Sequence, residues 1–337
     1  MMPRSSADPQ SERPPIEQLS AIAIGFSICR ALQTAAELEL PDCLASGPLT
    51  VEDLAKRTNT HAAGLFRLLR ALESVGVFRQ VSPSVFANTP ISDLIRKDVP
   101  GSQWAFLRAA SPGGGLYEAW AGLADSVRTG LPAFGQVNGC GIWEFMRRNP
   151  ERAAIFHQGM QSVQDRTTRA VSAAYDWRRF PVIADIGGGI GGQLLDIIST
   201  YPSCRGILFD QPEVIARSIP HDRIERDAGN FFQRVPSGAD AYILRSVIHD
   251  WADEESVAIL KTVRAATKPE SRVILIEQML PETPEFAVSK WLDLAMLVYA
   301  GGQERTATEY GKLLEEAGME VEQIVPTRLG IGLTISY

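Results

Sequence analysis

The hydrophobic pattern of the 337-residue chain changes character a little past its midpoint. On the N-terminal side, apolar residues recur at the three- and four-residue intervals of a helix, as at Leu65, Leu68, Leu69 and Leu72. On the C-terminal side, short apolar runs alternate with amphipathic stretches. The pattern therefore predicts a mainly helical N-terminal part followed by an α/β part.

The N-terminal part has the element order of a winged helix-turn-helix module, which we expect over residues 16–100. Residues 21–38 are rich in apolar side chains and predict one helix, with Pro41 as its stop signal. Residues 77–81 and 85–87 predict a short hairpin after the helices. Such a module either binds DNA or serves as a packing and dimerisation platform.

Composition narrows the classes of function. The net charge is −7, and this argues against a nucleic-acid partner, because phosphate binding needs a concentrated basic surface. We therefore favour dimerisation for the N-terminal module.

No run of eighteen apolar residues occurs, so no transmembrane helix is predicted. The scattered cysteines contain no Cys-x-x-Cys pair, which argues against structural zinc and favours a reducing cytoplasm; they are Cys29, Cys43, Cys140 and Cys204.

Four segments are expected along the chain. Residues 1–15 read as a disordered leader that lacks the apolar core of a signal peptide. The winged module follows over 16–100. Residues 101–175 form a helical, aromatic-rich segment that supplies one wall of a pocket. Residues 176–337 form the α/β domain.

The α/β domain is predicted to contain a doubly wound sheet. Helical stretches such as 254–266 and 307–317 separate most of its strands, and this alternation is typical of a parallel sheet. The last two strands are joined only by residues 327–330 and should be antiparallel. We therefore expect seven strands with one reversed. The predicted strands are Val182–Ile186, 206–210, 223–226, Ala241–Arg245, 273–277, Val321–Pro326 and 331–337.

A glycine-rich turn follows the first of these strands. Gly187, Gly189 and Gly192 satisfy G-x-G-x-x-G, which lets a ligand approach backbone at a helix N-terminus. Asp210, at the end of the next strand, is placed to hold two ribose hydroxyls. These features suit NAD and S-adenosylmethionine (SAM) equally. Asp185 favours SAM, because a carboxylate beside the loop repels a pyrophosphate and attracts an ammonium group.

His249 leaves a hydrophobic strand downstream of this turn, within the sequence Ser-Val-Ile-His-Asp-Trp. Its position suggests a base close to a bound cofactor. The alternative is a core histidine with satisfied hydrogen bonds.

Taken together, these segments resemble the plant-type O-methyltransferases, which act on caffeate and flavonoids and have bacterial relatives in antibiotic and pigment pathways. The resemblance extends from about residue 16 to 337. The shared motifs are the 185–191 loop, Phe-Asp-Gln-Pro at 209–212, Gly-Asn-Phe-Phe at 229–232, His-Asp-Trp at 249–251, Glu277, and Gly-Gly-Gln-Glu-Arg-Thr at 301–306.

The resemblance implies a dimeric enzyme that uses SAM, yields S-adenosylhomocysteine and needs no metal. His249 would take the proton of the acceptor hydroxyl, with Glu277 and Glu304 flanking and orienting it. Arg245 would approach the adenine through its backbone, and Trp251 would stack on the ring. The implied cofactor-binding residues are Asp185, Gly187, Gly189, Gly191, Asp210, Gln211, Asn230, Phe231, Arg245 and Trp251. The implied substrate-binding residues are Phe156, Met160, Asp250, Trp291 and Met296.

Three positions depart from the family pattern. Asn230 stands where aspartate is usual, although its amide oxygen can still accept from the adenine amino group. Arg245 replaces a frequent lysine. Gln164 replaces a small hydroxyl residue that helps to hold the SAM carboxylate.

The chemistry assigned to these residues is deprotonation and positioning. A phenol with a pKa of about 10 is mostly protonated at neutral pH. A neutral imidazole at His249 would accept that proton. Three other functions remain open at this point: a SAM-retaining enzyme that does not methylate, a ligand-sensing DNA-binding regulator, and an NAD-dependent oxidoreductase.

Overall fold

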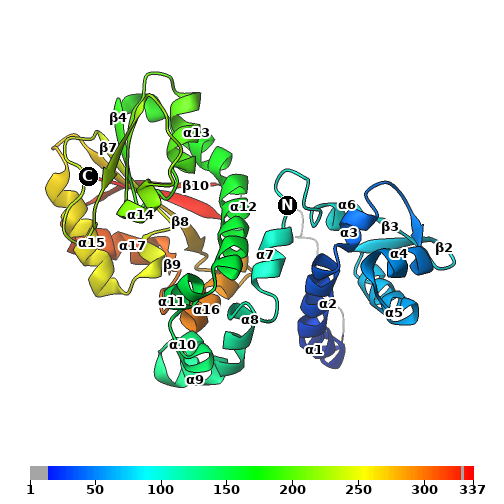
Figure 1. The fold of residues 1–337 in the computed structure, drawn as a ribbon. Coiled ribbons are helices and arrows are strands. Elements are labelled where there is room, and N and C mark those ends of the chain that lie inside the picture. Colours follow the sequence, from blue (N-terminus) through cyan, green and yellow to red (C-terminus); the bar gives the residue numbers. More distant parts are fainter. Residues whose placement is uncertain (1–13, 328–329) are drawn as a thin grey trace, which may run out of the picture. The chain divides into compact units, whose positions relative to one another are not determined.

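The computed structural model describes residues 14–327 and 330–337 (Figure 1). The chain forms two compact units, one made of Met1–Gly114 and Glu151–Ser162, the other of Gly115–Pro150 and Val163–Tyr337. The long helix α12 (Pro150–Ala174) runs through the boundary between them. The segment expected over 101–175 is therefore divided between the two units. Residues 1–13 of the expected leader lie outside the described residues, and Pro15 already begins a helix.

The first unit consists of helices around a small sheet. Strand β3 lies between β1 and β2 and is antiparallel to both, so the expected hairpin has a third strand that the sequence analysis missed. The helix, helix, hairpin order is confirmed. The elements are α1 (Pro15–Ala23), α2 (Gly25–Glu37), α3 (Leu40–Cys43), β1 (Leu49–Thr50), α4 (Val51–Thr58), α5 (Ala62–Glu73), β2 (Phe78–Ser82), β3 (Val85–Asn88), α6 (Pro90–Asp93) and α7 (Trp104–Ala109).

The prediction of one helix over residues 21–38 is wrong in two respects. The helix begins earlier, at Pro15, and is interrupted at Ile24, next to a glycine that favours a break. Pro41 does not simply stop it. The proline lies in the first turn of α3, where a missing N–H costs no hydrogen bond.

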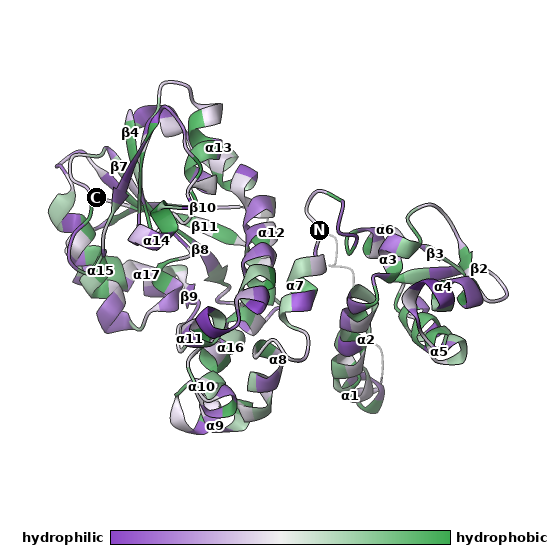
Figure 2. Ribbon diagram, in the orientation of Figure 1, coloured by the Kyte–Doolittle hydropathy of each residue, from purple (hydrophilic) through white to green (hydrophobic). Residues whose placement is uncertain are grey.

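Among the described residues, the segment from Pro15 to Glu37 is the one that bears on the membrane prediction, which it does not overturn. It spans 23 residues and is long and apolar enough, by length and composition alone, to cross a membrane. Polar residues interrupt any continuous apolar run, but they are too few to make the segment hydrophilic. Figure 2 shows hydrophobic residues along both helices. Ile16, Leu19, Ile22 and Phe26 are each at least 61% exposed, and their spacing places them on one face.

The second unit contains the predicted sheet, in the order β10-β11-β8-β7-β4-β5-β6. Only β11 is reversed along this path, which confirms the seven strands with one antiparallel member. The two-residue strand β9 pairs additionally with β8. The strands are β4 (Val182–Ile186), β5 (Arg205–Asp210), β6 (Ile224–Ala228), β7 (Ala241–Arg245), β8 (Arg272–Leu280), β9 (Arg305–Thr306), β10 (Val321–Pro326) and β11 (Ile331–Ser336).

Helices cover both faces of this sheet, as its continuous apolar strands require. Helices α15 and α17 pack side by side on one face (Figure 1), and α13 packs on the other. Successive residues of a strand alternate between the two cores, as Ile243 and Leu244 do. The helical elements are α8 (Leu116–Ala119), η1 (Trp120–Gly122), α9 (Leu123–Thr129), α10 (Ala133–Asn138), α11 (Ile142–Arg148), η2 (Trp177–Arg179), α13 (Gly192–Thr200), α14 (Pro212–Ile215), η3 (Ile248–Asp250), α15 (Asp253–Ala266), α16 (Val288–Tyr299) and α17 (Ala307–Glu316).

Candidate active site

The parallel register of the central strands brings the polar candidates to one edge of the sheet. Asp185 of β4 lies level with Ile243 of β7, and Arg245 at the end of β7 lies level with Ile276 of β8. Glu277 is the next residue along β8. Ligands of open α/β sheets bind at this carboxyl edge.

The glycine turn after β4 is shaped by backbone that other residues rarely adopt. Gly187, Gly189 and Gly191 all have positive φ, at 69°, 61° and 93°. A methyl group added at Gly187 would meet Val247 at 2.8 Å, whereas one added at Gly189 would enter open space. Gly191 precedes α13, so the turn faces a helix N-terminus. The turn therefore leaves room for a ligand against its backbone.

Asp185 lies under this turn and is buried, and neither of its carboxylate oxygens has a hydrogen-bond partner among the described residues. Burial raises its pKa to about 7, although the charge of Arg245 acts in the opposite direction. A buried carboxylate without a partner is costly unless a ligand satisfies it. The contact expected between Asp185 and the ammonium group of the SAM methionine end stays a prediction, and it requires the buried carboxylate to become accessible.

Asp210 holds the glycine turn through its own carboxylate. One oxygen accepts from the Gly189 N–H at 2.8 Å and the other from the Gln211 N–H at 2.7 Å. Burial raises the pKa of Asp210. Its predicted bonds to the ribose would use the remaining lone pairs of the same oxygens.

The residues predicted to border the adenine form an aromatic group. Trp251 meets Phe231 edge to face at 5.9 Å and Phe232 at 4.8 Å between ring centroids. The Asn230 side-chain oxygen accepts from the Phe232 N–H at 2.9 Å. This oxygen, which we expected to accept a hydrogen bond from the adenine amino group, thus already accepts one hydrogen bond within the turn that carries these rings.

Arg245 has a side-chain role that the sequence analysis missed. Its guanidinium donates to the Thr168 hydroxyl and the Gln193 side chain, each at 2.7 Å, to the Thr167 hydroxyl at 2.5 Å and to the Gln164 carbonyl at 2.9 Å. These bonds tie the C-terminal part of α12 and the start of α13 to the end of β7. These four bonds commit both terminal nitrogens of the side chain, and the predicted backbone contact with the cofactor stays a prediction. No local pattern in the sequence points to partners so far apart along the chain.

His249 lies in η3, the short helical turn that follows β7, and its ring is close to two carboxylates. Its Nδ1 atom is hydrogen-bonded to Glu304 Oε1 at 3.0 Å. Its Nε2 atom lies 3.5 Å from Asp250 Oδ1. The structure therefore brings the predicted base and one of its two predicted partners into direct contact.

Glu277 is buried beside this group but does not hydrogen-bond the ring. Its Oε1 atom accepts from the backbone N–H groups of Val247 at 3.1 Å and Ile248 at 2.9 Å. Its Oε2 atom has no hydrogen-bond partner in the part of the chain that the structure describes. Glu277 therefore fixes the backbone just before His249 and acts on the ring through its charge.

The carboxylates determine the charge of the imidazole. Burial alone would lower the pKa of His249, but the charge of Glu277, the hydrogen bond and charge of Glu304, and the charge of Asp250 raise it to about 10. Burial raises the pKa of Glu277 to about 7. The ring is thus mainly protonated at neutral pH. These carboxylates disfavour the neutral imidazole that has to accept the proton, and the role of His249 as the base stays a prediction.

The predicted substrate residues fall into two groups. Trp291, which is exposed, and the half-buried Met296 lie on α16, and Asp250 lies beside the ring of His249. Phe156 and Met160 lie on the part of α12 that belongs to the other compact unit, so their place in a pocket stays a prediction.

An aromatic pair that the sequence analysis did not single out lies at the end of α16. The Trp120 indole N–H donates to the Tyr299 hydroxyl at 2.6 Å, and the two rings meet edge to face.

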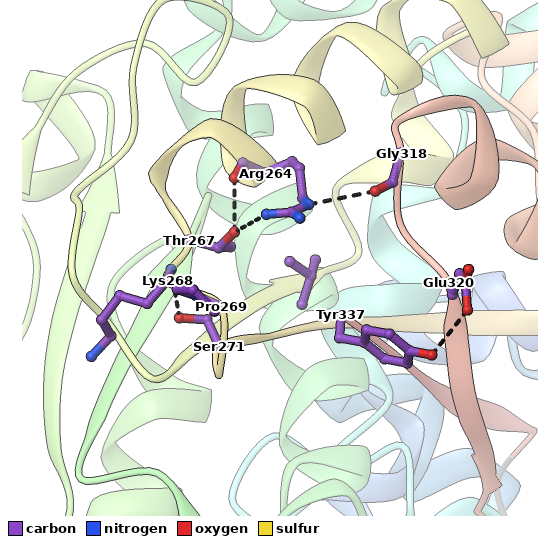
Figure 3. A pocket seen from close by; sticks show the side chains of 9 residues that line it. Arg264, Thr267, Lys268, Pro269, Ser271, Gly318, Glu320 and Tyr337 are labelled. Carbon is purple, nitrogen blue, oxygen red and sulfur yellow. Dashed lines mark hydrogen bonds between the residues drawn. The ribbon is translucent and has the colours of Figure 1, made fainter.

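A pocket of about 240 Å³ lies at the opposite edge of the sheet (Figure 3). It includes Val273 at the start of β8 and Tyr337, whose hydroxyl donates to Glu320 at 2.9 Å. Because Glu277 lies near the other end of β8, this pocket is separate from the His249 site. Its lining residues are Arg264, Thr267, Lys268, Pro269, Ser271, Val273, Gly318, Glu320 and Tyr337.

Comparison with known families accounts for both parts of the chain. Residues 120–320 match the model of an O-methyltransferase domain, and residues 21–98 match that of an O-methyltransferase dimerisation domain. The chain belongs to the plant-type O-methyltransferase family. The match confirms the resemblance inferred from the motifs. The protein is a SAM-dependent O-methyltransferase. This family assignment replaces two of the alternatives, the NAD-dependent oxidoreductase and the ligand-sensing DNA-binding regulator.

Individual relatives agree over nearly the whole chain. The phenazine O-methyltransferase PhzM of Lysobacter antibioticus is 36% identical over 316 residues, with 92% of each chain covered. The crystal structure of LaPhzM has a TM-score of 0.87 at 35% identity, covering 96% of this chain and 99% of that one. The O-methyltransferase NcsB1 from neocarzinostatin biosynthesis, in complex with SAM and a naphthoic acid, has a TM-score of 0.77 at 30% identity, covering 91% and 95%.

Proposed function

We propose that this protein methylates a hydroxyl group on a small aromatic acceptor, with His249 taking the hydroxyl proton. The observation that carries the proposal is the contact between His249 Nδ1 and Glu304 Oε1. His249 lies two residues after Val247, which packs beside Gly187 of the glycine turn. A polarised histidine beside a cofactor turn is what deprotonation of an acceptor requires.

The sulfonium methyl of bound SAM is already a strong electrophile, so the chain has to position and deprotonate the acceptor. The Glu304 bond to Nδ1 fixes the ring and leaves Nε2 to meet the acceptor hydroxyl. A phenol has a pKa of about 10, close to the value of about 10 for His249. Proton transfer between such matched groups is nearly balanced in free energy, and general base catalysis contributes roughly 10²–10⁴-fold.

Oxygen is proposed as the accepting atom, rather than nitrogen, because a dedicated base is present. A neutral aromatic amine does not have to lose a proton before it attacks. One relative, 34% identical, is an 8-amino-8-demethylriboflavin N,N-dimethyltransferase, so both outcomes occur among similar chains. A flat aromatic acceptor is supported by the naphthoic acid bound to NcsB1.

A homodimer is part of the proposal. The dimerisation model matches residues 21–98, and the exposed apolar face formed by Ile16, Leu19, Ile22 and Phe26 begins just before that region and extends into it. Such a face is covered in a stable soluble assembly. We also place the protein in a reducing cytoplasm, since its cysteines are free.

The experiment that tests this function is incubation of the protein with SAM and a matched panel of phenols and anilines. We expect phenols to gain one CH₂ unit while one equivalent of S-adenosylhomocysteine forms. Methylation of anilines alone would overturn the choice of oxygen. Consumption of an acceptor without S-adenosylhomocysteine would instead indicate a reaction that keeps the methyl group on SAM.

A further inference from the structure

A buried arginine connects the two segments that carry the proposed base and its carboxylate partner. Arg305 directly follows Glu304, and its side chain is only 2% exposed. Its guanidinium donates to the carbonyl of Trp251 at 2.9 Å and to that of Ile248 at 3.3 Å. These two carbonyls lie on either side of His249 in the sequence. The arginine therefore holds the base segment from both ends.

Asp253 anchors this arginine. Its Oδ1 atom accepts from Arg305 Nη2 at 2.7 Å and from Nε at 3.0 Å. The same oxygen accepts from the side chain of Gln303 at 2.8 Å. Because Asp253 is the first residue of α15, the anchor belongs to a helix packed on the sheet. An arginine fork bound in this two-point way has a fixed direction.

The backbone of the loop that carries Gln303 and Glu304 is held by two further hydrogen bonds. The Gln303 N–H donates to the His249 carbonyl at 2.8 Å, and the Glu304 N–H donates to Asp293 Oδ1 at 3.0 Å. Gly302 lies so close that an added methyl group would overlap the His249 carbonyl oxygen. The loop therefore rests on the base segment with no space for a side chain between them.

We propose that Arg305, held by Asp253, is a positioning residue that sets the distance between His249 and Glu304. It touches neither reacting atom. Without it, the His249 segment and the Glu304 loop are joined mainly by backbone bonds and by the Nδ1–Oε1 contact itself. The inference rests on the proposed role of His249, because a fixed Glu304 matters to the reaction only if that ring handles the proton.

The test uses Asp253→Ala, because this residue is 66% exposed, so its replacement removes the anchor of Arg305 without truncating a buried side chain. The matched control is Glu254→Ala, which removes the neighbouring charge from the same first turn of α15 and makes no bond to Arg305 among those described. Arg305→Lys is the second variant. A lysine keeps the charge but cannot form the fork, so we expect no rescue.

Two measurements are needed. Titration of the histidine rings by NMR follows His249 directly, since the chain has only four histidines and His249→Ala assigns the signal. We expect the His249 pKa to fall in Asp253→Ala and in Arg305→Lys, because the ring loses its closest carboxylate, and to stay unchanged in Glu254→Ala. We also expect kcat to fall roughly 10- to 100-fold, as misplacement of a catalytic group does, with SAM affinity retained.

An unchanged His249 titration in both variants would overturn the inference. If kcat also fell while the titration stayed unchanged, the loss of activity would reflect only a general loss of structure. Failure of the proposed function looks different. If His249→Ala turns over as fast as the wild type while Asp253→Ala still shifts the ring titration, the positioning holds and the role of the base is wrong.

Discussion

At the scale of single residues, the site is defined by an imbalance of charge around His249. One imidazole faces Glu304, Asp250 and Glu277, and only the last of these is committed to backbone N–H groups. Such a ring holds a proton tightly. It is therefore a strong base once that proton has left, which suits an acceptor that is itself a weak acid.

This charge predicts the pH dependence of the reaction. The fraction of His249 that can accept a proton grows about tenfold per pH unit below its pKa, which is about 10. We expect kcat/KM for a simple phenol to rise from pH 7 to 9 and to level off near 10. Initial rates at saturating SAM measure this. A profile that is flat between pH 7 and 9 would contradict the assigned charge state.

Replacing Glu277 by glutamine separates its two roles. Glu277→Gln keeps an oxygen for the N–H groups of Val247 and Ile248 but removes the charge that contributes most to the raised pKa of His249. The rising limb of the pH profile should move to lower pH. A Glu282→Gln variant, altered on an exposed side chain beyond the same strand, serves as the control. No movement of the limb would show that the Glu277 charge does not reach the ring.

Asp185 gives a prediction about cofactor binding and stability. In the folded protein its pKa is raised from 3.8 to about 7, so folding favours the protonated form and its contribution to stability falls as pH rises from about 4 to 7. Asp185→Asn removes this pH-dependent loss of stability. We expect the variant without SAM to melt at or above the wild-type temperature at pH 8, yet to bind SAM roughly 10-fold more weakly or worse. Thermal melting and calorimetric titration measure the two effects. A variant that binds SAM normally would contradict the contact.

At the scale of elements, the parallel strands of the second unit decide where the chemistry lies. The alternation of apolar runs with helices was enough to predict the seven strands, because burial on both faces leaves a strong hydrophobic signal. The short connection over 327–330 predicted the reversed strand. The same register then placed Asp185, Arg245 and Glu277 at one edge. This part of the site follows from local sequence and strand direction.

Other features could not be predicted, because they depend on partners distant in sequence. The Arg245 bonds to Thr168 and Gln193 depend on how α12 and α13 meet β7. The clustering of Asp253 with Arg305 depends on a loop folding back on a helix. The raised pKa of His249 depends on how closely Glu277 and Glu304, which are distant in sequence, approach the ring. The spacing of hydrophobic residues does not predict such contacts.

The Arg245 network predicts a specific loss of stability. Arg245→Lys shortens the side chain and keeps at most part of its four hydrogen bonds to α12 and α13. We expect a loss of about 1–3 kcal/mol in the free energy of unfolding. Denaturant unfolding checks this, with the exposed Arg205→Lys as the matched control. Equal stability of the two variants would mean that the network is not needed to hold α12.

At the scale of the whole molecule, the α1–α2 face predicts the assembly. Introducing charge at Leu19 and Ile22 (Leu19→Glu with Ile22→Glu) should shift the protein from dimer toward monomer, because the charge would have to be buried against the partner. Ser20→Glu, on the same helix, is the control. Sedimentation velocity measures the change. A wild-type monomer, or a dimer unaffected by the double change, would contradict the assigned interface.

The central claim is that His249 removes the acceptor proton, and a single-turnover comparison of wild type with His249→Ala tests it most directly. Two phenols are used, one with a pKa of about 10 and one already ionised at the assay pH. We predict that the variant loses roughly 10²–10⁴-fold in rate with the first phenol and much less with the second, while binding SAM as the wild type does. Equal rates of wild type and variant with the weakly acidic phenol would contradict the account.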